Sequence, residues 1–459
     1  MKKPRNLDSI RFYTSCVVVD NWLYAIELPD LDPRLQRRYE RLVREHMAVT
    51  NDLAAGLRAL PEMKDSFAAA QGAWRFYRNP RVSLSALMGP LLRHARGAIA
   101  TQCQDYVLAV HDWSALGFAK HESKTDRVPL NTKRPAGYEL LTGLLLSDQT
   151  GDPLAPVYQE LTTADGVLST RSNRRLPQRA HLDSLTLAQA HLERLELGKP
   201  IVHIVDAEAD SVGYLRRWQA KKQRFVTRGD DVRWVQWKGQ ESQVGTIWPQ
   251  LAFRFSRQVE YHGRAAQQWV AETEVTLHRP AREHRLVKGR HVHRTHQGRP
   301  LDLRLVVSEV RDETGRVLAR WLLWTNVGGV SAETIALWYY WRWRIESYFK
   351  LLKRAGHHVE QWQQSCASAV ARRLLVTAMA CVVVWDLARS QAPDASEARK
   401  LLVRLSGRLM KRGVEFTQPA LLAGMWVLLA MLDTLEDYTQ EELRQLAAQF
   451  LPLPRIESG

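Results

Sequence analysis

The chain has 459 residues, of which 45% are hydrophobic and 25% charged, so it can bury a substantial core, and its length predicts two to four folded units. Its 65 lysines and arginines outnumber its 49 aspartates and glutamates, and the formal net charge of +16 favours a polyanionic partner. The positive net charge leaves two classes of partner, nucleic acid and an anionic membrane surface.

The apolar segments argue against the membrane. The longest apolar run, Leu374 to Trp385, ends at Asp386 and is shorter than the ~20 residues of a membrane-spanning helix. The first residues also lack the order of charged, apolar and small residues that marks a signal peptide, so we expect a soluble protein inside the cell. The cysteines form no CxxC pair and predict reduced thiols rather than disulfides or a zinc site. They are Cys16, Cys103, Cys366 and Cys381.

The first hundred residues have a helical pattern with many arginines. Charged residues with helical spacing run from Asp32 to about Leu60, and two further helices are predicted at about Asp65 to Tyr77 and Ser83 to Arg96. One interpretation is a helical bundle with a solvated charged face. The other, favoured by the number of arginines, is a DNA-binding domain.

Alternating strand and helix patterns follow. The short apolar runs predict strands buried on both faces, and the second and third form a hairpin. These runs are Tyr106 to Val110, Tyr138 to Leu146, Leu154 to Tyr158 and Pro200 to Val205. A basic loop, Arg171 to Arg179, and an amphipathic helix, Asp183 to Leu197, lie between the third run and the fourth. The pattern predicts a mixed α/β sheet, with Asp112 and Asp206 at strand ends.

Beyond this sheet the pattern changes twice. From Arg224 to about Asn326 it consists of short alternating strands rich in Val, Thr and Trp, which indicates a β-rich insertion. After Asn326 the chain is predicted to be helical, with breaks at Pro393 and Pro419.

The predicted helix from Ala332 to Arg354 carries the most informative side chains. At ~100° per residue, Tyr339, Arg342, Glu346 and Lys353 fall within an arc of about 60°. An apolar stripe lies beside them and places them at the margin of a core. Its members are Trp338, Ile345, Phe349 and Leu352. Taken alone, this helix is equally compatible with an ordinary ion pair between Arg342 and Glu346.

Three carboxylates distant in sequence favour a functional site over an ordinary ion pair. Asp112 and Asp206 at strand ends, and Glu346 on a helix packed against the same sheet, can converge to hold two divalent cations. Phosphodiester cleavage uses such an arrangement, and oxygen ligands suit magnesium or manganese better than zinc. Each aspartate alone is more typical of a turn or a helix cap.

These residues resemble one known family. Tyr339, Arg342, Glu346 and Lys353, with two, three and six residues between them, resemble the YREK signature of the insertion-sequence family four cut-and-paste transposases. Asp112 in Val110-His-Asp-Trp-Ser114 and Asp206 in Ile204-Val-Asp-Ala-Glu-Ala-Asp210 are similar to the blocks around that family's two catalytic aspartates. Ala73 to Pro80 resembles its end-binding domain. The resemblance covers about residues 30 to 385.

The resemblance implies a domain plan and a reaction. It implies a DNA-end-binding helical domain at 1–97 and an RNase-H-like catalytic core at 98–365 with the β-rich insertion at about 229–316. Residues 366–459 are expected to form a helical domain that is a candidate for dimerisation, but the closing motif with glycine and tryptophan of longer relatives is absent after about Ala388. The resemblance also implies a DDE transposase in which Asp112, Asp206 and Glu346 bind two Mg²⁺ ions, for which Mn²⁺ can substitute. Water nicks a transposon end, the freed 3′-hydroxyl forms a hairpin, and the reopened end is joined to target DNA.

The same resemblance implies partners and DNA contacts. The partners are the terminal inverted repeats and target DNA, bound by a homodimer in the bacterial cytoplasm near the nucleoid, with no membrane. Tyr339, Arg342 and Lys353 are expected to contact phosphates, as is Arg228. A tryptophan is expected to stack on a base flipped from the transposon end, and Trp321 occupies the matching place, with Trp324 as second choice.

Alternatives remain. A catalytically silent, transposase-derived inhibitor would bind ends without cutting them, and another RNase-H-like nuclease would cut without making hairpins. His291, His293 and His296 lie among basic residues and predict a basic hairpin that touches DNA phosphates, with zinc binding as the weaker interpretation because no fourth ligand is evident.

Overall fold

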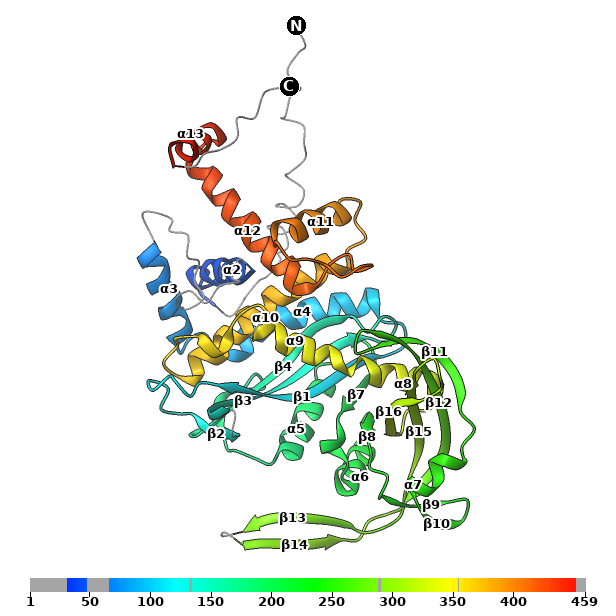
Figure 1. Ribbon diagram of the computed structural model, residues 1–459. Helices are drawn as coiled ribbons and strands as arrows, with labels where there is room; N and C mark the ends of the chain where they lie inside the picture. Colours follow the sequence, from blue (N-terminus) through cyan, green and yellow to red (C-terminus); the bar gives the residue numbers. More distant parts are fainter. Residues whose placement is uncertain (1–30, 48–65, 132–133, 288–289, 354, 451–459) are drawn as a thin grey trace. The chain divides into compact units, whose positions relative to one another are not determined.

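The computed structural model describes residues 31–47, 66–131, 134–287, 290–353 and 355–450 (Figure 1). The chain divides into two compact units. The first combines residues 1–86 with residues 350–459, and the second comprises residues 87–349. Within the described residues, helices dominate the first unit and a large sheet dominates the second.

The first unit is built around the helix α10, Ala367–Arg389. The other helices of this unit are α2 Pro33–Met47, α3 Ser66–Arg78, α11 Ala395–Leu405, α12 Gln418–Asp437 and α13 Gln440–Phe450, with the short η6 Val359–Gln361. Helices α2, α3, α11 and α12 all contact α10. Arg372 on α10 donates to the backbone oxygens of Tyr77 (2.9 Å) and Val82 (2.6 Å), which ties α10 to the end of α3 and the turn after it.

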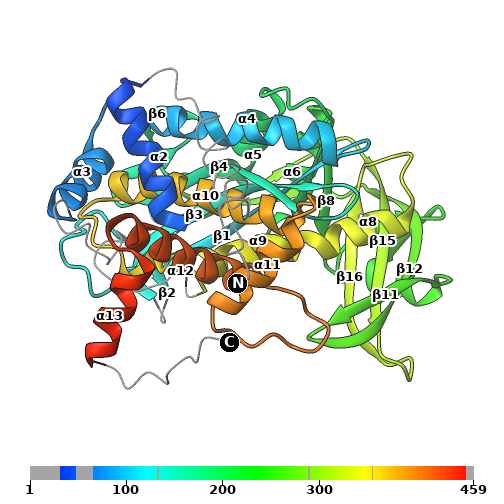
Figure 2. The same ribbon diagram turned by 90° about the horizontal axis from the view of Figure 1, so that it is seen from above.

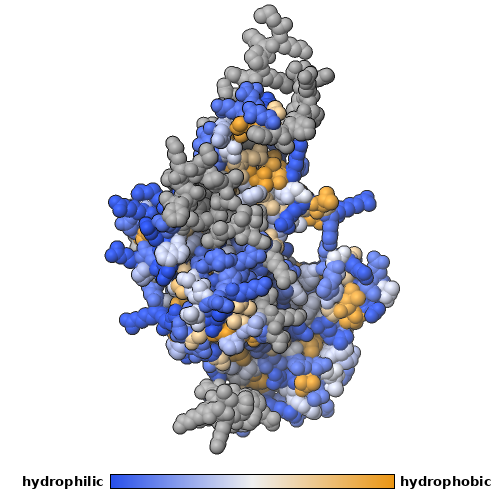
Figure 3. Space-filling model, turned by 60° about the vertical axis from the view of Figure 1, so that its left-hand side comes forward, coloured by the Kyte–Doolittle hydropathy of each residue, from blue (hydrophilic) through white to orange (hydrophobic). Residues whose placement is uncertain are grey.

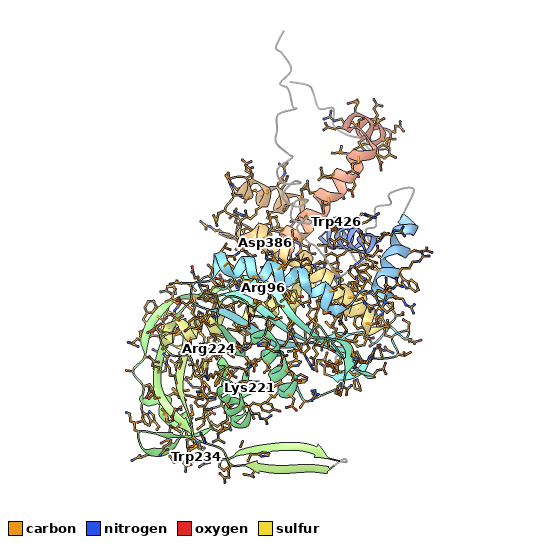
Figure 4. All side chains as sticks on the ribbon, turned by 180° about the vertical axis from the view of Figure 1, so that it is seen from behind. Arg96, Lys221, Arg224, Trp234, Asp386 and Trp426 are labelled. Atoms are coloured by element: carbon orange, nitrogen blue, oxygen red, sulfur yellow. The ribbon has the colours of Figure 1, made fainter. Side chains whose placement is uncertain are left out.

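Among the described residues of this unit, two helices are long and apolar enough to cross a membrane by length and composition alone. The apolar window of α10 is 89% buried, which is typical of the core helix of a globular unit. The window of α12, which carries Trp426 (labelled in Figure 4), is 39% buried. On the face seen in Figure 3, described hydrophobic residues gather only in small patches among hydrophilic ones.

Buried polar side chains lie along α10. Arg373 is fully buried, rests on the ring of Trp362 at 4.0 Å and donates to Gln364 at 2.9 Å. The side chains of His357 and Cys381 meet at 3.5 Å. Burial, with Arg373 nearby, lowers the pKa of His357 from 6.5 to about 3. Cys103, Cys366 and Cys381 are free thiols, as predicted, and Cys16 lies outside the described residues.

The low pKa of His357 predicts a pH-dependent stability. The unfolded chain takes up the proton near pH 6.5 and the folded chain only near pH 3, so stability is full above pH 6.5 and falls as the pH drops. Between about pH 7.5 and 5, the free energy of unfolding should fall by about 2 kcal/mol on this account. Urea unfolding at both pH values measures it. His357→Asn should remove that part of the pH dependence, whereas the neighbouring His358→Asn should keep it; equal slopes in both variants would contradict the assignment.

The second unit contains a 14-stranded sheet in the order β10-β9-β12-β15-β16-β8-β7-β1-β3-β4-β5-β6, with β2 on β3 and β11 on β12. The strands of its first half are β1 Val107–Gly117, β2 Val128–Asn131, β3 Arg134–Ser147, β4 Pro153–Thr163, β5 Gly166–Ser169, β6 Ser172–Leu176, β7 Ile201–Val205 and β8 Arg224–Arg228. Those of its second half are β9 Trp234–Trp237, β10 Gln240–Gln243, β11 Arg254–Tyr261, β12 Arg264–Leu277, β15 Leu301–Arg311 and β16 Val317–Thr325. The predicted mixed α/β class is confirmed.

The middle of the sheet mixes parallel and antiparallel strands. β1 pairs antiparallel with β3, which pairs antiparallel with β4, and the predicted hairpin is confirmed. β1 pairs parallel with β7, and β7 parallel with β8. Neighbouring parallel strands need a long crossover connection, which usually contains a helix. Helix α5, His181–Glu193, precedes β7, and helix α6, Val212–Ala220, connects β7 to β8. Figure 1 shows both helices on one side of the sheet.

The other side of the sheet carries α8 Ala332–Tyr340, η5 Trp341–Trp343 and α9 Arg344–Leu352. Helix α8 contacts β8, β12 and β15. Helix α4, Leu84–Gln102, precedes β1. Figure 2 shows α8 lying across the strands of the second half.

The second half of the sheet encloses a core with α6. Trp218 on α6 and Trp324 on β16 are fully buried there with Phe225. The short α7 Val244–Ile247 and η4 Trp248–Gln250 complete this part. The hairpin of β13 Ala281–Val287 and β14 Arg290–His296 forms a separate two-stranded sheet that extends away from the large one (Figure 1), so the predicted hairpin exists. The side chains of His291 and His293 lie outside the described ones.

Three details of the predictions are wrong. Asp112 does not end its strand, because β1 continues to Gly117 against β3 after its pairing with β7 stops. The helix predicted from Ala332 to Arg354 is interrupted by η5, where the ring of Trp341 packs against Gly151 in the turn after β3. The predicted loop from Arg171 to Arg179 contains strand β6, which pairs with β5. The part of the predicted first helix beyond Met47, up to Leu60, lies outside the described residues and stays a prediction.

Candidate active site

The sheet brings the two aspartates to the same level. Val110 on β1 pairs with Ile204 on the parallel strand β7. Asp112 and Asp206 each lie two residues further along, so they lie at the same level. Strand β7 ends at Val205, and Asp206 begins the 3₁₀ turn η3, Ala207–Ala209, where its Oδ1 accepts from the backbone N of Ala207 at 2.7 Å. Asp112 Oδ1 accepts in the same way from the N of Trp113 at 2.8 Å.

A single guanidinium joins these aspartates to Glu346. Arg342 Nη1 lies 3.3 Å from Asp112 Oδ2, and Nη2 lies 3.2 Å from Asp206 Oδ2 and 3.6 Å from Glu346 Oε1. The Arg342 side chain is 7% exposed, and the three carboxylates are 24%, 37% and 30% exposed. We call Asp112, Asp206, Glu346 and Arg342 the carboxylate cluster. The ordinary helical ion pair between Arg342 and Glu346 is thus one part of a larger arrangement.

Burial and charge oppose each other in the cluster. Burial raises the pKa of Asp112, and Arg342 opposes that shift by favouring the carboxylate. Burial also disfavours the charge of Arg342, but Tyr339 and the three acids outweigh it and raise the pKa of the guanidinium. Arg342 therefore serves as the internal counterion of three carboxylates.

Tyr339 and Arg228 extend the cluster around Asp206. The Tyr339 hydroxyl donates to Asp206 Oδ1 at 3.0 Å, and burial together with Asp206 raises the pKa of the phenol, which keeps it a neutral donor. Arg228, at the end of β8, is 44% exposed, and its Nη1 lies 4.0 Å from the same oxygen. The labelled Arg224 marks the start of this strand in Figure 4.

The remaining predicted residues have different settings. Lys353 lies in the turn after α9, is half-buried and belongs to the first unit, whereas the three carboxylates belong to the second. Trp321 on β16 is 9% exposed, with its ring 6.2 Å from that of Tyr339. Trp324, the second choice, is fully buried, and its Nε1 donates to Asp210 at 3.3 Å. Stacking on a base would require either ring to be uncovered.

Two nearby features were missed by the sequence analysis. Trp343, beside Arg342 in η5, is 48% exposed, although nothing in its spacing distinguished it from the other tryptophans. His181 bridges Glu139 and Glu208 next to the aspartates. It begins α5, and no motif marks it. Asp210 is a structural residue, since it pairs with Arg233 at 2.9 Å and is 8% exposed.

The donor set of the cluster suits a hard cation. Within the described residues, no three His, Cys, Asp or Glu side chains are arranged to hold a metal ion, and the three acids of the cluster lie around Arg342. Their oxygens nevertheless meet around one positive charge, and carboxylate oxygens are what magnesium and manganese prefer. Arg342 Nε is buried and has no hydrogen-bond partner among the residues that the structure describes, so the described surroundings leave one donor of this guanidinium unused.

No protein-family model matches the chain, and no curated protein matches its sequence.

Removal of the internal counterion should make stability depend on divalent cations. In Arg342→Gln, three partly exposed carboxylates would repel one another, and we expect a loss of about 2 kcal/mol, less than the 3 to 5 of a fully buried pair. Millimolar Mg²⁺ should restore much of it. Thermal unfolding in EDTA and in Mg²⁺ measures both effects. The exposed neighbour Arg344→Gln is the control, and an Arg342 variant as stable as this control in EDTA would contradict the counterion role.

Proposed function

We propose that the protein is a metal-dependent DNA-cutting and DNA-joining enzyme of the DDE transposase type. The observation that carries this proposal is the carboxylate cluster. Asp112, Asp206 and Glu346 come from three distant parts of the chain and meet around one guanidinium. Bringing three partly buried acids together costs folding free energy. Convergent titratable groups of this kind are therefore candidates for functional sites.

The strand order supports an RNase-H-like core. Five strands, β4-β3-β1-β7-β8, combine an antiparallel meander with two parallel strands joined through helices. This order puts the first acid on the central strand and the second at the end of its parallel neighbour. We therefore propose that β9 to β15 form an insertion between β8 and the helix that carries Glu346.

Each residue of the cluster has a proposed part. Asp112, Asp206 and Glu346 would hold the Mg²⁺ ions, which supply Lewis acidity for hydrolysis and transfer at phosphodiesters. Arg342 would exchange carboxylate oxygens for the phosphate of the bound strand, since a guanidinium binds both kinds of oxygen in pairs. Tyr339 keeps Asp206 oriented and offers its hydroxyl near the same phosphate.

The charge of the chain supports the DNA partner. The net charge of +16 and the exposed Arg228 beside the cluster favour a polyanionic strand there. We propose that the substrates are transposon ends and target DNA, that two copies act on paired ends, and that the reaction takes place in the bacterial cytoplasm.

The proposal is tested by incubating the protein and Mg²⁺ with DNA that carries its flanking repeats. A denaturing gel should show nicks and then hairpins at the repeat ends. Asp112→Asn, Asp206→Asn and Glu346→Gln should each abolish nicking but keep end binding, because the metal ligands are lost and the DNA-binding charge is not. The matched control is Asp302→Asn, an exposed acid on β15.

Other outcomes would replace the proposal. Tight end binding without any cutting would identify a silent inhibitor. Cutting without hairpins at linear ends would identify another type of nuclease. A variant of any of the three acids that cuts at the wild-type rate would remove that acid from the site.

Trp321 is tested separately. If its ring is uncovered to hold a flipped base, Trp321→Ala should slow hairpin formation by about 5- to 150-fold, the equivalent of 1 to 3 kcal/mol of stacking, and slow first nicking less. Single-turnover gels resolve the two steps. Trp234→Ala on β9, labelled in Figure 4, is the control. Equal slowing of both steps by Trp321→Ala would contradict the stacking role.

A further inference from the structure

His181 is held between two glutamates beside the carboxylate cluster. Its Nε2 lies 2.8 Å from Glu139 Oε2, and its Nδ1 bonds to Glu208 Oε1. The imidazole is 37% exposed, Glu139 is 27% exposed, and Glu208 is 48% exposed. Because both ring nitrogens are engaged by carboxylates, neither has a lone pair turned toward a metal, so this group is a bridge and not a second metal site.

The bridge connects to both catalytic aspartates. The ring of Trp113 stacks on His181 with centroids 4.8 Å apart and an interplanar angle of 15°. The backbone N of Trp113 donates to Asp112 at 2.8 Å. On the other side, Glu208 belongs to η3, the turn that Asp206 begins. One imidazole thus touches the residue after the first aspartate and the turn of the second.

The bridge is anchored on a packed helix and a paired strand, and its imidazole is charged at neutral pH. His181 is the first residue of α5, whose buried face includes Leu185, and Glu139 lies on β3 opposite Ala115 of β1. Glu139 first, and then Glu208, raise the pKa of His181 to about 10. The bridge is therefore an imidazolium between two carboxylates at neutral pH, and such charge-assisted hydrogen bonds are stronger than neutral ones.

We propose that His181 is a positioning residue that holds Asp112 and Asp206 in register for divalent cation binding. This inference rests on the proposed function, because it assigns His181 a part in the same site. The residue acts through Trp113 and Glu208 and does not touch the metal or the DNA. Groups that orient metal ligands in this indirect way commonly change metal affinity or activity by about 10- to 100-fold when they are lost.

A competing electrostatic effect has the opposite sign. Loss of the imidazolium leaves Glu208 uncompensated, and Glu208 is close enough to contribute to the raised pKa of Asp112. An additional negative charge attracts a divalent cation, whereas disorder of the two aspartates weakens its binding. Glu208 is nearly half exposed and solvent screens its field, so we expect the loss of order to prevail.

The test is a titration of the DNA-free, full-length protein with Mn²⁺, in which electron paramagnetic resonance measures free Mn²⁺. His181→Ala should weaken Mn²⁺ binding by about 10- to 100-fold. Glu139→Ala should also weaken it, and Glu139→Gln, which keeps an acceptor for the imidazole, should restore most of the affinity. His278→Ala is the matched control, because His278 also binds a glutamate, Glu241, at 2.7 Å, but in the second half of the sheet.

The outcomes separate this inference from the proposed function. Mn²⁺ binding by His181→Ala that is as tight as wild type, or tighter, with only a lower melting temperature, would overturn the positioning role. Equal effects of Glu139→Ala and Glu139→Gln would also overturn it. If wild type binds Mn²⁺ and His181→Ala binds it more weakly, but wild type never nicks repeat DNA, the proposed function is contradicted and the positioning role stands. A wild-type protein that binds no Mn²⁺ would contradict both.

Discussion

The contact of the Arg342 guanidinium with three carboxylates is the interaction on which the rest of the account depends. Asp112 lies within β1, Asp206 follows β7, and Glu346 lies on α9, so each acid could be explained separately as a strand, cap or helix residue. The guanidinium makes them one group, with all three oxygens within 3.6 Å of its nitrogens. Without it, the negative charges of the three carboxylates would repel one another with no counterion between them.

On the proposed function, the site would alternate between two kinds of counter-charge. In the structure, the single charge of Arg342 offsets part of the negative charge of the three acids. With divalent cations bound, the cations would take over that role and the guanidinium would become available to a phosphate. The exchange changes partners among groups that are already assembled, so little of the fold has to be reorganised. Tyr339 donates to Asp206, and the His181 bridge contacts Glu208 and stacks on Trp113, so on our inference these groups would keep the two aspartates in place while the partners change.

Much of this was predictable because it depends on local patterns. Apolar runs predicted the strands around Asp112 and Asp206, and helical spacing predicted that Tyr339, Arg342 and Glu346 share one face. Other features depend on contacts between distant segments, which spacing does not encode. The packing of Trp341 against Gly151 breaks the predicted helix. The convergence on Arg342 needs the sheet register. His181 lacks any motif, since its partners lie on a strand and a turn far away in the chain.

The central claim is that Asp112, Asp206 and Glu346 form one cation-binding site. Its most direct measurement is an anomalous difference map from crystals of the protein soaked in Mn²⁺. We expect anomalous peaks within coordinating distance of all three carboxylates, with Arg342 turned away from at least one of them. A map with no peak at these acids, and Arg342 still bound to all three at saturating Mn²⁺, would contradict it.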